Sequence, residues 1–87
     1  MPYIKPENRK PYDPLINELV AELKKHGSQA GDLNYVFSRV AKALLQANLR
    51  YDEANKLIGA IECVKLELYR RAIAPYEDGK IVENGDI

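Results

Sequence analysis

The chain has 87 residues, and its 13 Lys and Arg balance its 13 Asp and Glu, so the formal net charge is zero. A neutral chain has no overall attraction to nucleic acid or to an anionic membrane surface, which leaves only local patches for such partners. The length fits one small domain spanning residues 1–87, and a hydrophobic content of 46% excludes a chain that is disordered by composition.

The first fourteen residues hold four of the five prolines, at positions 2, 6, 11 and 14. Each proline fixes its own φ and biases the preceding residue toward extended geometry. We therefore expect an extended, Pro-rich N-terminal arm over residues 1–13.

Three helices are predicted after the arm, over about 14–26, 32–48 and 51–74, which makes the fold class all-α with a helical body at 14–74. Asp13 before Pro14 is a typical helix start, and Gly27 is a typical stop. The residues from Gly27 to Gly31 are the predicted linker, with Asp32 capping the second helix. Pro75 is expected to end the third helix.

The third predicted helix has small or apolar residues on more than one side, and such a helix needs more than one neighbour. We expect it to pack on the first two helices and, as a hypothesis, on a copy of itself. The interface candidates lie away from its main apolar stripe and are Gly59, Ala60, Cys63 and Leu66. Cys63 could pair with His26 as a thiolate and base, but a mid-helix thiol among apolar neighbours is better interpreted as packing.

The last residues, 75–87, carry a net charge of −3 and two turn dipeptides, Asp78-Gly79 and Asn84-Gly85. We expect an irregular acidic tail, with a short strand at residues 80–83 as the alternative.

Polar residues of the third helix form the second candidate site, which consists of Glu62, Lys65, Tyr69, Arg70 and Arg71. If they converge on a cavity, burial would shift their pKa values and favour acid/base chemistry or small-molecule binding. The alternative for Glu62 and Lys65, which the spacing favours, is an i,i+3 ion pair at a helix surface or dimer interface.

The outer face of the second helix is basic, and its candidates are Tyr35, Arg39, Lys42 and Arg50. Such a stripe could meet phosphates or an acidic protein, although a solvated face explains it too. Three positive charges and one aromatic ring are few for a nucleic-acid site.

Several segments carry a resemblance that spans nearly the whole chain. They are Met1-Pro2-Tyr3-Ile4, Leu33-Asn34-Tyr35, Asn55, Ile58-Gly59, Glu62-Cys63, Lys65-Leu66-Glu67, Tyr69-Arg70-Arg71, Pro75-Tyr76-Glu77, Lys80-Ile81 and Glu83-Asn84-Gly85-Asp86. The chain resembles a family of short uncharacterised proteins, a domain of unknown function, found in tailed bacteriophages and some prokaryotes. The family has no established activity. The resemblance implies that arm and tail belong to the domain, docked together near Tyr69, Arg70 and Arg71.

The sequence therefore favours a non-enzymatic helical interaction module that acts as a homodimer and binds an unidentified protein. The two alternatives are a small-molecule binder or enzyme that uses the third helix and a weak nucleic-acid binder that uses the second. One cysteine allows no internal disulfide, and no Cys/His cluster predicts a zinc site. We expect no cofactor, no metal, no membrane segment and a cytoplasmic location.

Overall fold

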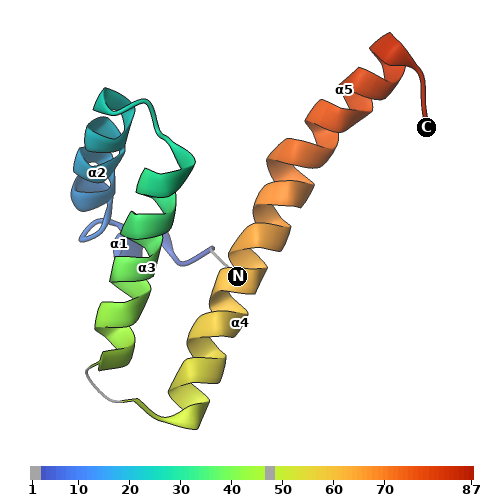
Figure 1. Cartoon of the computed structure of the whole chain (residues 1–87). Helices are drawn as coiled ribbons and strands as arrows, with labels where there is room; N and C mark the ends of the chain where they lie inside the picture. Colours follow the sequence, from blue (N-terminus) through green and yellow to red (C-terminus); the bar gives the residue numbers. More distant parts are fainter. Residues whose placement is uncertain (1–2, 47–48) are drawn as a thin grey trace. The chain divides into compact units, whose positions relative to one another are not determined.

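The computed structural model describes residues 3–46 and 49–87, and all regular structure in these residues is helical (Figure 1). The prediction of an all-α fold is confirmed. The described chain divides into two units, Tyr3–Ala54 and Asn55–Ile87.

The first unit begins with a short helix, α1 (Pro6–Arg9), so the prediction of a wholly extended arm is wrong. Lys5 before it is extended, with φ −61° and ψ 146°, and its carbonyl accepts from the Asn8 N–H at 2.9 Å. Pro6 occupies the first turn, where its missing N–H costs no hydrogen bond. Residues 1 and 2 of the predicted arm lie outside the described residues.

Helix α2 (Asp13–Lys25) starts one residue earlier than predicted, with Asp13 inside the helix rather than before it. Tyr12 is the capping residue, and its carbonyl accepts from the Ile16 N–H at 2.9 Å without a side-chain cap. The Asp13 carboxylate still lies at the positive end of the helix dipole, which is favourable without a cap bond.

Gly27 ends α2, as predicted. It has φ +78°, and its N–H donates to the Lys24 carbonyl at 3.2 Å, while the Ser28 N–H reaches the Leu23 carbonyl at 2.9 Å. These two bonds form a Schellman motif, which satisfies carbonyls that the helix end leaves open. Ser28 also adopts a positive φ, of 51°.

Helix α3 (Ala30–Gln46) begins two residues before the predicted start. The Leu33 N–H donates to the Gln29 carbonyl at 3.0 Å, so Gln29 precedes the helix and Asp32 lies in its first turn. The prediction that Asp32 caps the helix is therefore wrong. The predicted end at residue 48 lies outside the described residues.

Helices α2 and α3 together line a shallow depression of about 140 Å³ near the Gly27 turn. Leu19 and Leu23 of α2 and Val36 of α3 supply its apolar lining. Other large apolar side chains of α3, Phe37, Val40 and Leu44, are exposed.

The second half of the chain departs most from the prediction. Helix α4 (Tyr51–Leu68) continues through a π-helical turn, η1 (Tyr69–Ile73), into α5 (Ala74–Asn84). The predicted helix end at 74, the irregular tail and the alternative strand at 80–83 are all wrong. The count of three helices is also wrong, because α1 is added and the third helix extends by a π-turn and α5.

The π-turn explains how the helix passes Pro75. A proline inside an α-helix lacks an N–H and clashes with the carbonyl four residues earlier. In this helix, Ala74 keeps α-helical angles, φ −60° and ψ −46°, and its N–H bonds to the Tyr69 carbonyl five residues back. The wider π-turn shifts the hydrogen-bond register just before Pro75, so Pro75 is accommodated in the first turn of α5.

None of the described residues is buried. Between Asn55 and Ile87 this follows from the secondary structure, because the described residues there form one helix and no second element for it to pack against. Its large apolar side chains from Ile58 to Val82 are 42–86% exposed.

Candidate interaction surface

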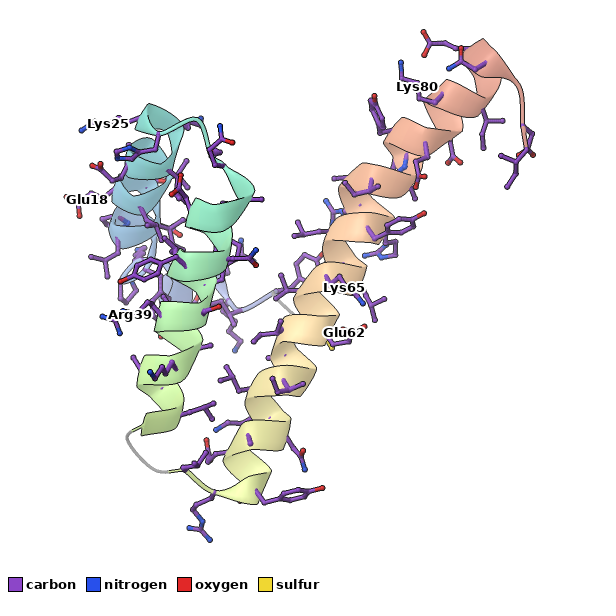
Figure 2. The ribbon with its side chains drawn as sticks, viewed as in Figure 1. Glu18, Lys25, Arg39, Glu62, Lys65 and Lys80 are labelled. Atoms are coloured by element: carbon purple, nitrogen blue, oxygen red, sulfur yellow. The ribbon has the colours of Figure 1, made fainter. Side chains whose placement is uncertain are left out.

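Glu62 and Lys65 form an ion pair on the surface of α4, with 2.9 Å between Glu62 Oε1 and Lys65 Nζ (Figure 2). Both side chains are more than half exposed. Water weakens the attraction between two such exposed charges, and holding both long side chains in place costs entropy, so the pair has little effect on stability. Glu62 and Lys65 therefore form the i,i+3 ion pair that their spacing in the sequence predicts.

Tyr69 and Glu77 are joined across the π-turn, where the Tyr69 hydroxyl donates to Glu77 Oε1 at 2.6 Å. In a regular α-helix, side chains eight residues apart point in different directions, whereas seven apart share a face. The π-turn takes up one extra residue, so these two side chains meet as if they were seven apart.

The hydrogen bond to Glu77 raises the pKa of Tyr69 above its ordinary value of 10.0, and the charges of Glu77 and Asp78 and a slight loss of hydration add to it. A raised pKa means that the protonated hydroxyl stabilises the folded segment below about pH 10, and that this contribution is lost as the pH rises through the raised value.

We expect the absorbance titration of Tyr69, taken as wild type minus Tyr69→Phe, to have its midpoint above the ordinary tyrosine value. Glu77→Gln removes the negative charge and should move that midpoint back toward the ordinary value. A Tyr69 midpoint that is the same with Glu77 and with Gln would contradict the pairing.

Arg70 bonds Glu67, with 2.5 Å between the Arg70 guanidinium and Glu67 Oε1. Tyr69 and Arg70 therefore each bond a residue outside the predicted polar set, while Glu62 and Lys65 bond each other. Arg71 lies next to Arg70 on η1. Glu62, Tyr69 and Arg70 thus contact three different partners spaced along the helix.

The predicted interface residues all lie on α4 and are all exposed: Gly59, Ala60, Cys63 and Leu66. Gly59, Cys63 and Leu66 follow one another at steps of four and three, so they share a helix face, and Ala60 lies beside it. A Cβ added at Gly59 would meet nothing within 4 Å. Cys63 is thus an exposed thiol rather than a packed one.

The predicted basic stripe is divided. Tyr35, Arg39 and Lys42 are exposed on α3, whereas Arg50 lies beyond the end of that helix, directly before α4. Arg50 Nε is 3.9 Å from Asp52 Oδ1. Tyr35 also lines the depression between α2 and α3.

That depression contains polar residues which sequence reasoning did not group. Glu22, His26 and Asp32 line it, and His26 Nε2 is 3.0 Å from Glu22 Oε2. Lys25 Nζ also reaches Glu22, at 3.5 Å. The i,i+4 spacing of Glu22 and His26 is a signal that could have found this pair. In residues 3–46 and 49–87, no three or more His, Cys, Asp or Glu side chains gather where they could hold a metal ion.

Comparison with known proteins gives a family and no activity. The family described as Domain of unknown function (DUF6899) matches residues 1–87. The chain belongs to this family. No curated protein and no solved structure matches it. The resemblance to a domain of unknown function is therefore confirmed, and membership in this family adds no site residue.

Among the described residues, no helix is both long enough and apolar enough to cross a membrane.

Proposed function

We propose that the chain is a non-enzymatic helical interaction module that acts as a homo-oligomer. One observation carries this proposal: the segment from Asn55 to Asn84 is one continuous helix, and the described residues of its unit include no other element against which its large apolar side chains could pack.

A helix in water is stabilised mostly by packing its apolar face, because nucleation is unfavourable and propagation adds little per residue. Large apolar side chains lie on more than one side of this helix: Ile61 is 47% exposed, Leu66 57% and Val82 86%. Burying an apolar side chain of this size contributes about 1.5–3 kcal/mol. Association with another surface is therefore strongly favoured for this segment, and a second copy is always present at the concentration of the chain.

Sedimentation velocity of the full chain over a wide concentration range tests the proposal. We expect the sedimentation coefficient to rise with concentration toward a dimer, and the helical circular dichroism signal to fall on dilution. A chain that sediments as a monomer at all concentrations, with unchanged helicity, would contradict it.

The proposal extends to the location and a further partner of the chain. A reducing, cytoplasmic location is supported by a single cysteine that is exposed and free. An additional protein partner is supported by the exposed Phe37, Val40 and Leu44 of α3. The expected phage and prokaryotic distribution rests on the sequence resemblance alone.

Neither alternative function gains support from the geometry. Glu62, Tyr69 and Arg70 contact three different partners along the long helix, and Arg50 lies beyond the end of α3, the helix that carries Arg39 and Lys42.

A further inference from the structure

A row of five residues at steps of four runs along the long helix from α4 into α5. It consists of Leu66, Arg70, Ala74, Asp78 and Val82, and we call it the Arg70–Asp78 row. A step of four is slightly more than one α-helical turn and slightly less than one π-helical turn, so the π-turn between Arg70 and Ala74 offsets part of the drift.

The row lies open to solvent. Leu66 is 57% exposed and Val82 is 86% exposed, and Asp78 is exposed as well. The side chain of Arg70 is 67% exposed even though it contacts Glu67. Ala74, in the middle, is the smallest side chain of the row and is partly exposed.

The row has the same kind of side chain at equal distances on either side of Ala74, except that the two charged residues have opposite signs. Apolar Leu66 lies eight positions before Ala74 and apolar Val82 eight after it, while basic Arg70 and acidic Asp78 lie four positions to either side. A two-fold interface requires this kind of self-complementarity, because residue i of one copy contacts residue j of the other and the reverse contact repeats it.

We propose that the Arg70–Asp78 row is the contact surface for a second copy of the chain, with the two helices antiparallel and Ala74 at the two-fold axis. Arg70 of each copy then lies opposite Asp78 of the other, and Leu66 lies opposite Val82. This inference rests on the proposed function, since it names the partner and the geometry of the same association.

The charges of the row favour the antiparallel arrangement over a parallel one. No cation lies within ion-pair distance of Asp78 among the described residues, so a second copy can supply one. A parallel pairing in register would instead place Arg70 against Arg70 and Asp78 against Asp78, and like charges at an interface oppose association. The small side chain of Ala74 lets the two backbones approach closely at the axis.

Charge reversal tests the pairing. Arg70→Glu should raise the dimer dissociation constant of the full chain roughly thirtyfold, because two like-charge contacts replace two attractive ones. Asp78→Lys should do the same. An equimolar mixture of the two variants, and the double variant Arg70→Glu with Asp78→Lys, should both recover association. Arg71→Glu is the matched control, because it makes the same charge change at the next residue, which lies on another face of the helix. It should change the dimer dissociation constant by less than about threefold.

Cross-linking tests the orientation. Ala74→Cys in a Cys63→Ser background should oxidise to a disulfide-linked dimer, since the two copies meet at residue 74. Cys63 in the wild type should not, because an antiparallel pair centred on residue 74 separates the two thiols by 22 residues, about 33 Å along the axis.

The outcomes distinguish this inference from the proposed function. A wild-type chain that stays monomeric overturns both. Two results would contradict the row as the contact surface but keep the proposed homo-oligomer. One is a dimer that is insensitive to Arg70→Glu and Asp78→Lys, and the other is a dimer that cross-links through Cys63 and not through residue 74.

Discussion

Replacing Gly27 by Ala is expected to destabilise the α2–α3 hairpin by about 1–2 kcal/mol. Gly27 has φ +78°, a left-handed conformation that an L side chain adopts only at a cost. The added Cβ would also lie 3.1 Å from Gln29 Nε2, so that side chain must move. The Schellman bonds to Leu23 and Lys24 depend on this geometry and would weaken with it.

Thermal unfolding of the full chain followed by circular dichroism measures the effect, as a lower midpoint for Gly27→Ala than for wild type. Gly31→Ala is the matched control. Gly31 lies in the first turn of α3, its φ is not positive, and an added Cβ meets nothing within 4 Å. We expect that control to be neutral or slightly stabilising, because Ala favours helix over Gly. Equal midpoints for the two variants would show that the Gly27 turn does not hold the hairpin.

The hairpin was predictable because its signals are local and agree with one another. Apolar residues at helical spacing define α2 and α3, and Gly27 marks the boundary. The errors of one and two residues at the helix starts have one cause: Asp13 and Asp32 were both interpreted as caps. Acidic residues are favoured both at the cap and in the first turn, so their presence locates a helix start only to within a few residues.

The long helix was not predictable by the same rules. Pro75 and the Asp78-Gly79 dipeptide are both typical of chain breaks, and the structure places both inside helix. No sequence pattern predicts the π-turn at 69–73, yet that turn allows the helix to continue through Pro75.

The same turn explains which contacts of the candidate surface could be foreseen. The Glu62–Lys65 pair follows from i,i+3 spacing in an ordinary α-helix. The Tyr69–Glu77 bond joins residues eight apart, a spacing that predicts no contact unless the extra residue of the π-turn is known. The self-complementary row could likewise be recognised only after residues 74–84 were known to be helical.

Replacing Gly79 by Pro is expected to break α5, with a loss of about 3 kcal/mol in the stability of that helix. Gly79 lies in the middle of α5, where a proline would remove a backbone hydrogen bond and clash with the carbonyl of Pro75. The helical circular dichroism signal should fall, and amide exchange should become faster through residues 74–84.

Gly79→Ala should act in the opposite direction and stabilise α5 by about 0.5–1 kcal/mol, because Gly79 has no positive φ and an added Cβ meets nothing within 4 Å. Gly85→Ala is the matched control at the helix end, where φ is +87° and an L side chain is strained; we expect it to lower stability. If residues 75–87 instead formed an irregular tail with a turn at Asp78-Gly79, Gly79→Ala would be neutral or destabilising. Opposite signs at Gly79 and Gly85 therefore support a helical tail, and with it the Arg70–Asp78 row, whereas the same negative sign at both would exclude them.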